Sequence, residues 1–486
     1  MASLEEIRNE RLKKLALLRE RGINPYPIES HVSATLEEVR DDFNTFVKKK
    51  TLTLAGRVML LRKQGALAFF NIFDGTASFQ GLIKKDDSKD FDLFDQTVDA
   101  GDFIEVTGKL FVTKRGEKTL EVSGLRMLAK SLLPLPEKWH GLSDVEERFR
   151  KRYLDLIANE ETRARFLKRS KVISYLRETL DEAGYLEVET PVFQPVYGGA
   201  SAEPFTTHHN ALDMDLYLRI SDELYLKRLL IGGFPKIYEI SKDFRNEGID
   251  VTHWPEFTML EFYEAFSDAP KQMAFVEKIM KGVAKCIDKK GVLTYDGQKI
   301  DFSKKFAVKK YGDVITEYTQ LKNPLEATKG ELEAEGSRVE ASFDPRESNV
   351  KILDAIFKKA VRPHLTEPVF LTDYPADYLP LTKQHEDNPR LVDAFQFYAG
   401  GFELVKAFSE LNDPLDQRAR FEAQEKRKAE GETDTQKLDE DFLEAMEYGM
   451  PPAGGVGIGI DRLMMLLTDT KNIKEVIFFP TMRQKN

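Results

Sequence analysis

The most constraining feature of the sequence is a change in its residue pattern near residue 131, where a series of short β-rich runs ends. Residues 52–130 hold about five short runs rich in β-branched and aromatic residues, broken by Gly and Asp: LTLAGRVMLL, LAFFNIFDG, SFQGLIKK, DFIEVTGKLFVTKRG and KTLEVSGLRMLA. Such runs predict β-strands, and about five strands in so short a segment favour a small barrel. An OB-type barrel, which binds oligonucleotides or sugars, and an SH3-like barrel fit the pattern nearly equally well.

The length of 486 residues is too great for one ordinary domain. We expect a helical extension over 1–50, a barrel over 51–131, a proline-containing linker over 132–145 and a larger α/β domain over 146–486. In the last domain, residues 160–184 predict a long helix closed by Gly184, followed by a strand, YLEVETPVF, that stops at Pro191. Residues 267–380 carry no chemical signature and are interpreted as an insertion or a subdomain.

Composition and known short motifs exclude several classes of protein. The net charge of −10 argues against bulk coating of nucleic acid, although a local basic face stays open. No apolar run approaches the roughly 18 residues of a membrane span, and the charged start lacks a secretory signal, so we expect a cytoplasmic protein without a membrane partner. A single cysteine, Cys286, excludes an intrachain disulfide. No dinucleotide-binding or P-loop motif is present.

The densest chemical region is FRNEGIDVTHWPEFTMLEF, residues 244–262. Arg245 and Glu247 alternate, which on a strand places both on one face. A turn then leads into a second strand that carries Phe257, Met259 and Glu261 on one face. Arginine clamps phosphate and a phenyl ring stacks on a purine, so this hairpin is a candidate nucleotide site. The alternative is an ordinary sheet with an exposed ion pair.

Two further segments contain residues suited to binding a ligand or a metal. In GGVGIGIDR, residues 454–462, glycines alternate with apolar residues before a helix, which allows close approach of a ligand and places Arg462 in the first helical turn. The alternative is a structural ion pair between Asp461 and Arg462. In GGFELVKAFSELND, residues 400–413, Glu403 and Glu410 lie among apolar residues, where inward carboxylates need a metal or an ammonium partner. Exposure at the rim is the alternative.

Taken in order, YLEVETPVF, FRNEG with PEFT, and GIGIDR resemble the three signature motifs of class II aminoacyl-tRNA synthetases. The pieces RYLDLI, THHNALDMDLYLRISDELYLKRLLIGG and FSELND are similar to the class II lysyl-tRNA synthetases of bacterial type. This resemblance implies an α+β fold with an N-terminal OB-fold β-barrel. The catalytic domain would contain a six- or seven-stranded antiparallel sheet flanked by helices, and two chains would form a homodimer through the first motif.

The resemblance also implies the reaction. Lysine and ATP would give lysyl-adenylate and pyrophosphate with Mg²⁺ as cofactor, and the lysyl group would pass to the 3′ end of tRNA(Lys). Adenylation joins a carboxylate to a phosphate, so alignment and positive charge suffice and no general base is expected.

The family's site residues carry over to matching positions of this sequence. Arg245 and Arg462 would be catalytic. The ATP site would comprise Arg245, Glu247, His253, Phe257, Glu403 and Arg462. The lysine site would comprise Gly199, Glu223, Arg245, Glu261, Tyr263, Lys406, Phe408 and Glu410. Phe257 would stack on adenine, with Arg462 on the opposite side of the base. The ε-ammonium group would be surrounded by Glu261, Glu410 and Tyr263. The anticodon would be read by Phe69 and Gln80.

Three positions depart from the family pattern. Lys406 replaces an Asn that touches the amino acid, and would pair with the substrate carboxylate or repel its ammonium group. Gln396 replaces a magnesium-binding glutamate, which leaves Glu403 as the matched metal ligand. Gly124 replaces a third anticodon contact, usually Glu, so Phe69 is expected to contribute most by stacking on a base.

Three other functions stay open. An aspartate or asparagine synthetase shares the domain order but needs a cationic or amide-reading pocket, whereas FSELND is acidic. A protein-lysine ligase lacks the N-terminal barrel. A nucleic-acid-binding protein with an inactive appended domain would not need Arg245, Glu247, Phe257 and Arg462.

Overall fold

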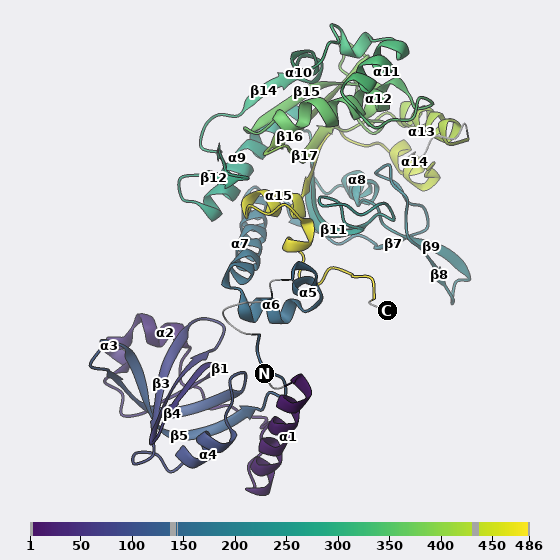
Figure 1. Ribbon diagram of the computed structural model, residues 1–486. Coiled ribbons are helices and arrows are strands. Elements are labelled where there is room, and N and C mark those ends of the chain that lie inside the picture. Colours follow the sequence, from purple (N-terminus) through teal and green to yellow (C-terminus); the bar gives the residue numbers. More distant parts are fainter. Residues whose placement is uncertain (1–2, 137–141, 143, 430–436, 485–486) are drawn as a thin grey trace. The chain divides into compact units, whose positions relative to one another are not determined.

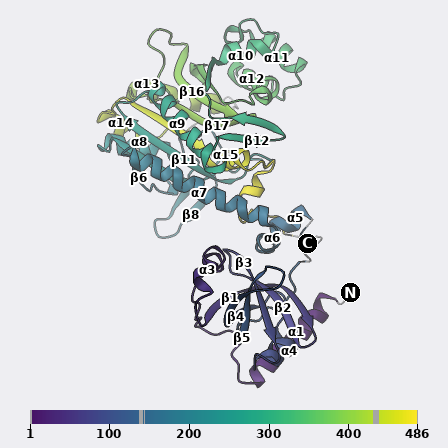
Figure 2. The same ribbon diagram turned by 90° about the vertical axis from the view of Figure 1, so that its left-hand side faces the viewer.

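The computed structural model of the chain describes residues 3–136, 142, 144–429 and 437–484. The chain divides into two compact units, Met1–Asp144 and Val145–Asn486, drawn in Figures 1 and 2. Among the described residues, no helix combines the length and the apolar character needed to cross a bilayer.

The first unit is a closed five-stranded barrel with strand order β1-β2-β3-β5-β4. Its alternating burial, such as that of β2, places Phe70 and Ile72 inside and leaves Phe69 on the outer face. The barrel predicted for this segment is therefore confirmed. Its elements are α1 (Leu4–Glu20), α2 (Leu36–Asp41), α3 (Phe43–Phe46), β1 (Leu52–Gln64), β2 (Leu67–Phe73), β3 (Ser78–Lys84), α4 (Phe91–Thr97), β4 (Phe103–Val112) and β5 (Lys118–Ala129).

Buried charges hold the first unit together. Arg11 of α1 donates to the carbonyl oxygens of Ala100 and Leu133, both at 2.9 Å, so this basic side chain fixes the helix within the unit. Lys130, fully buried, forms ion pairs with Asp99 at 2.6 Å and Asp102 at 2.7 Å. A buried cation requires such partners, because desolvation without them is strongly unfavourable.

The second unit is built on an eight-stranded sheet of order β14-β15-β16-β17-β18-β11-β10-β6. The two outermost pairs are parallel and the others are antiparallel. Its strands are β6 (Leu186–Glu187), β10 (Lys236–Phe244), β11 (Glu256–Ala265), β14 (Ala307–Lys310), β15 (Val369–Pro375), β16 (Leu391–Ala399), β17 (Phe402–Ser409) and β18 (Ala453–Gly459). Smaller sheets contain β7 (Phe193–Gln194), β8 (Thr206–His209) and β9 (Met214–Leu218), and β12 (Val292–Tyr295) with β13 (Gln298–Asp301).

Helices cover both faces of this sheet. One hydrophobic core joins it to α7, α9 and α15, and a second joins it to α8, α10, α12 and α14. Figure 1 places α10, α11 and α12 near β14 and β15, at one end of the sheet. The α-helices are α5 (Val145–Arg150), α6 (Arg152–Ala158), α7 (Glu160–Glu182), α8 (Glu223–Ile231), α9 (Ala269–Ile287), α10 (Tyr311–Tyr318), α11 (Lys329–Arg338), α12 (Asn349–Ile356), α13 (Pro414–Ala429), α14 (Glu440–Glu447) and α15 (Ile460–Leu467). Short helical turns are η1 (Pro324–Glu326), η2 (Phe357–Val361), η3 (Arg362–His364), η4 (Ala376–Tyr378) and η5 (Ile473–Val476).

Several details differ from the sequence-based expectations. The sheet has eight strands rather than six or seven, because the short β6 and β14 join its edges. The strand expected to run to Pro191 is limited to Leu186–Glu187, and Val188 adds one more backbone bond to β10. Residues 267–380 are not a separate insertion, since α9 contributes to the main core and β15 is a strand of the sheet.

Candidate active site

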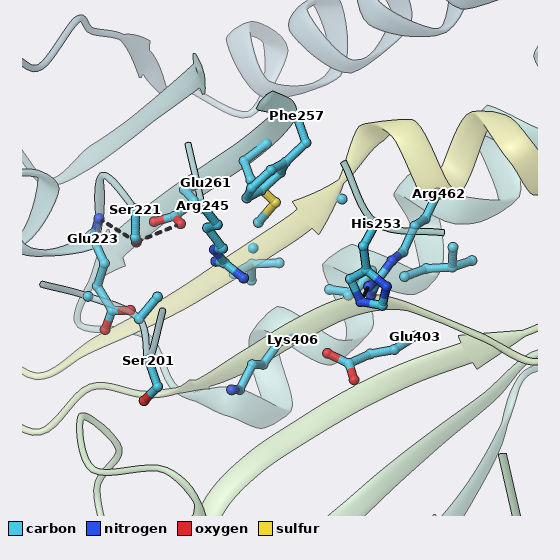
Figure 3. A pocket seen from close by; sticks show the side chains of 18 of the residues that line it. Ser201, Ser221, Glu223, Arg245, His253, Phe257, Glu261, Glu403, Lys406 and Arg462 are labelled. Atoms are coloured by element: carbon cyan, nitrogen blue, oxygen red, sulfur yellow. Dashed lines mark hydrogen bonds between the residues drawn. The ribbon is translucent and has the colours of Figure 1, made fainter. Parts of the chain in front are cut away.

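One cavity of about 420 Å³ opens over the middle of the large sheet. It is lined by β11, β17, β18 and the start of α15, and by the loops around residues 199–201, 245–255 and 378–382. Figure 3 shows labelled side chains from these segments directed into the same space. The predicted ATP and lysine residues that line it are Gly199, Glu223, Arg245, Glu247, His253, Phe257, Glu261, Tyr263, Glu403, Lys406, Phe408 and Arg462.

The hairpin predicted for residues 244–262 forms, but with a longer loop. β10 and β11 pair from Lys236 with Glu264 to Phe244 with Glu256. Phe257 and Glu261 lie on the cavity side of β11, as the alternation predicts. The placement of Arg245 and Glu247 on a strand is wrong, because β10 ends at Phe244 and both residues belong to the loop that follows.

Arg245 covers the ring on which the nucleotide base was expected to stack. Its guanidinium carbon lies 4.9 Å from the centroid of the Phe257 ring. A planar guanidinium group favours this position over an aromatic face. Phe257 is thus covered by a cationic group within the protein, and the expected adenine sandwich with Arg462 requires Arg245 to move or to share the ring.

Arg462 is held by a short chain of polar groups. Arg462 donates to Nε2 of His253 at 2.5 Å, and Nδ1 of His253 lies 2.8 Å from a carboxylate oxygen of Asp250. Desolvation and the neighbouring Arg462 lower the pKa of His253. A low pKa favours the neutral imidazole ring, which is the form that can accept a hydrogen bond from Arg462. Its Nδ1–H then donates to Asp250 while Nε2 accepts from Arg462.

The suggested ion pair between Asp461 and Arg462 is wrong. Asp461 instead accepts from Arg169 of α7 at 2.7 Å and from the backbone N–H of Thr258 at 2.7 Å. It therefore ties the first turn of α15 to α7 and β11. Because this carboxylate points away from Arg462, the arginine is available to the cavity.

The opposite end of the cavity is acidic. Glu261 of β11 accepts from the hydroxyl of Ser221 at 3.1 Å and from that of Tyr263 at 2.9 Å. Burial, together with the charges of Asp243 and Glu223, raises the pKa of Glu261 to about 8. A bound ammonium group would supply the positive charge that this carboxylate lacks.

Glu410 is placed behind the cavity wall and not on it. It is fully buried and forms an ion pair with Lys227, whose ammonium group also contacts Glu223 at 2.7 Å. Burial lowers the pKa of Lys227, but the two carboxylates outweigh it and raise the pKa. A methyl group at Gly455, which does line the cavity, would lie 2.0 Å from Oε1 of Glu410, so only a glycine backbone separates this carboxylate from the cavity.

A β-bulge in β17 decides which of its side chains reach the cavity. Phe397 pairs with Val405 and Tyr398 with Glu403, so Leu404 is an extra residue. In a regular strand, their spacing of three would place Glu403 and Lys406 on opposite faces. The extra residue shifts the alternation by one, so both side chains lie on the same face.

Lys406 is an isolated cation in the wall. Its ammonium group lies 5.8 Å from the centroid of the Tyr378 ring, and no carboxylate within the described ranges forms an ion pair with it. Burial lowers its pKa, while the charges of Glu403 and Glu223 act in the opposite direction.

The residues suggested for magnesium differ in their availability. Gln396 is buried, and its amide oxygen accepts from the hydroxyls of Tyr374 at 2.9 Å and Tyr398 at 2.5 Å, so it does not line the cavity. Glu403 does line the cavity. A metal here would depend on one protein carboxylate and on oxygen atoms of a bound substrate, an arrangement that suits Mg²⁺.

Ser221 and Lys227 were not predicted from the sequence, and Asp461 was given the wrong partner. The spacing of four between Glu223 and Lys227 in ELYLK is a detectable signal for an ion pair on one helix face. Neither the hydrogen bond of Ser221 nor the two partners of Asp461 has a local signal, because both depend on distant segments.

Comparison with known proteins agrees with this geometry. The family model described as tRNA synthetases class II (D, K and N) matches residues 144–483, and that of the OB-fold nucleic acid binding domain matches residues 52–128. The chain is 45% identical to the lysine–tRNA ligase of Chloroflexus aurantiacus, over 99% of both chains. It is 46% identical to that of Moorella thermoacetica, over 98% of this chain and 97% of the relative, and to that of Methanoculleus marisnigri, over 97% and 94%.

Proposed function

The chain belongs to the class II tRNA synthetases, in the family of the lysine–tRNA ligases, and we propose that it activates lysine with ATP and transfers the lysyl group to tRNA(Lys). The observation that carries this proposal is the separation of charge along one cavity. Figure 3 shows Arg462 and His253 at one end, Glu223 and Glu261 at the other, and Arg245 between them.

Adenylation brings two anions together. The α-carboxylate of lysine attacks the α-phosphate of ATP, and pyrophosphate leaves. Arg245 is positioned to neutralise the carboxylate and the α-phosphate, and Arg462 to neutralise the departing phosphates. His253 orients Arg462 through its Nε2 atom. The attacking carboxylate is already ionised and has no proton to lose, so no side chain is required as a general base. The fixed cations only align the two anions and neutralise their charge.

Lysine is selected by the acidic end of the cavity. Glu261, supported by Ser221 and Tyr263, receives the ε-ammonium group, and Glu223 receives the α-ammonium group. Glu410 acts from behind the wall, because its charge is shared with Lys227. Lys406 adds positive charge near the substrate carboxylate, where it does not compete with the ammonium sites.

Mg²⁺ is the expected cofactor, with Glu403 as its protein ligand. When bound, the ion would neutralise phosphate charge in ATP. Glu403 is preferred over Gln396 for this role, because the amide oxygen of Gln396 already accepts hydrogen bonds from two tyrosines.

The barrel is the proposed anticodon-binding domain. Phe69 of β2 and Gln80 of β3 lie on its outer face, and Gln80 pairs in register with Asn71, two residues from Phe69. An outward ring of this kind stacks on an unpaired base. Gly124 offers no side chain to a third contact.

The chain is further proposed to form a cytoplasmic homodimer. Apolar side chains of the first motif are exposed, with Leu167 at 62%, Leu186 at 50% and Phe193 at 56%. Exposed apolar side chains on adjoining elements are typical of a protein–protein interface. Light scattering of the wild type and of Leu186→Lys tests this, and an equal mass for both, at the monomer value, would contradict it.

Amino-acid-dependent exchange of pyrophosphate into ATP tests the activity. Lysine should support exchange while aspartate and asparagine should not, and purified tRNA should then be charged. Lys406→Asn should raise the KM for lysine more than the KM for ATP, because Lys406 is proposed to pair with the carboxylate of lysine. Exchange with aspartate alone, or exchange without charging, would overturn the proposal.

A further inference from the structure

Three carboxyl groups meet behind the acidic end of the cavity. Asp222 precedes α8, Asp243 lies on β10 and Glu261 lies on β11, and one oxygen from each falls within 4.8 Å of the others. Glu261 lines the cavity, whereas Asp222 and Asp243 are fully buried and do not. The two aspartates therefore form a second acidic layer that cannot contact a substrate directly.

Hydrogen-bond donors satisfy only half of the aspartate oxygens. The hydroxyl oxygen of Ser241 lies 3.0 Å from Oδ1 of Asp222 and 3.4 Å from Oδ1 of Asp243, and Nε of Arg219 lies 3.5 Å from the latter. Oδ2 of Asp222 and Oδ2 of Asp243 have no donor within the part of the chain that the structure describes. Two buried acceptors without a donor are unfavourable, and a proton carried by one of the two aspartates would satisfy both.

The neighbouring charges leave room for one such proton. Once Glu261 is ionised beside a bound ammonium group, the six carboxylates of this network outnumber its four cations by two, and a bound lysine supplies one net positive charge. One further proton balances the remainder. The groups that face Asp222 and Asp243 from the surrounding elements, or lie in the same network, are the carboxylates Glu223, Glu239, Glu261 and Glu410, the cations Arg219, Lys227, Arg245 and Lys406, and the phenol of Tyr263.

A divalent metal fits this position less well than a proton. Magnesium keeps several water ligands, and the two aspartates are inaccessible to solvent. Burial also raises the pKa of both Asp222 and Asp243, which favours a protonated state of the pair.

We propose that Asp222 and Asp243 share one proton at neutral pH and act as positioning residues for Glu261, fixing the charge behind the amine site at a single negative. This rests on the proposed lysine activity. When an ammonium group binds and Glu261 ionises, the shared proton leaves the aspartate pair with one negative charge instead of two behind that carboxylate. Either aspartate is able to carry the proton, and the net charge of the pair is the same in both cases.

Isosteric amide variants test the proposal. Asp222→Asn and Asp243→Asn each replace the shared proton by an amide donor and keep one negative charge. Each should therefore leave the KM for lysine at pH 7 within about threefold of wild type. The double variant removes the remaining charge and should raise the KM for lysine by about tenfold or more, with little change in the KM for ATP. Asp439→Asn, at a buried acid that does not line the cavity, is the control.

A direct readout of the proton accompanies the kinetics. Infrared difference spectra between the wild type and each single variant, both with lysine bound so that Glu261 is ionised, should show the band of one protonated carboxyl group at neutral pH, and the same band in both. A tenfold rise of the KM for lysine in each single variant, or no protonated carboxyl band, would mean that both aspartates are ionised and would overturn the proposal. A stoichiometric divalent metal that is lost in the variants would overturn it as well. Absence of lysine-dependent exchange in the wild type would instead refute the proposed function.

Discussion

Gly455→Ala is the substitution for which the structure gives the sharpest expectation. A methyl group at this position would lie 2.0 Å from Oε1 of Glu410 and 2.5 Å from Cε1 of Tyr263. Neither neighbour is free to move, because Glu410 is paired with Lys227 and both Glu410 and Tyr263 are buried. Overpacking of this kind costs about 1–3 kcal/mol, which is about 5- to 150-fold in an equilibrium or rate constant.

We expect this strain to appear in lysine use. The kcat/KM for lysine should fall within that range or further, since displacing Glu410 also disturbs its ion pair with Lys227. The KM for ATP should change little, because Arg462 and His253 lie at the far end of the cavity. Steady-state pyrophosphate exchange, with each substrate varied in turn, measures both.

Gly330→Ala is the matched control. A methyl group there meets no atom within 4 Å, and the residue lies within α11, where alanine is favoured over glycine by about 0.5–1 kcal/mol. This variant should be as active as wild type and slightly more stable. If Gly455→Ala has the lysine KM and the thermal stability of wild type, the close packing of Glu410 against the cavity floor is refuted.

Three other outcomes are expected. Because the pKa of Glu261 is raised to about 8, its carboxylate is scarce below that pH, so kcat/KM for lysine should rise with pH and level off above about 8; Glu261→Gln should abolish this dependence, and a flat wild-type profile would contradict it. Lys130→Met leaves Asp99 and Asp102 without their buried cation and should lower the free energy of unfolding by about 3–5 kcal/mol, measured by urea denaturation, whereas a loss below about 1 kcal/mol would argue against the pair. Phe69→Ala should weaken tRNA binding by about 1–3 kcal/mol without altering lysine-dependent exchange, and unchanged binding would exclude base stacking.

Regular local patterns made part of this molecule predictable. Strand alternation correctly placed Phe257 and Glu261 on one side of β11, and the glycine-rich run correctly placed Arg462 at the start of a helix. These features depend on side-chain periodicity and on residues adjacent in the chain, which a sequence displays directly.

Other parts depend on contacts that the sequence does not display. Alternation predicts that Arg245 continues the strand, but β10 ends at Phe244, and the N–H of Arg245 makes one further backbone bond, to the carbonyl oxygen of Pro255. Asp461 is next to Arg462 in the chain, but its ion-pair partner is Arg169, which is distant in the chain. Glu410 has the acidic character expected of an amine ligand, but Lys227 already satisfies it.

The extra residue at Leu404 has a consequence for how this fold tolerates sequence change. Upstream of it, the inward or outward direction of each side chain in β17 is reversed relative to a regular strand. Deleting one residue here would turn the Glu403 carboxylate toward the hydrophobic core on the other face of the sheet, while Lys406 and Phe408 would stay in place. Length variation in this strand should therefore be far more damaging than replacement of any one of its amino acids.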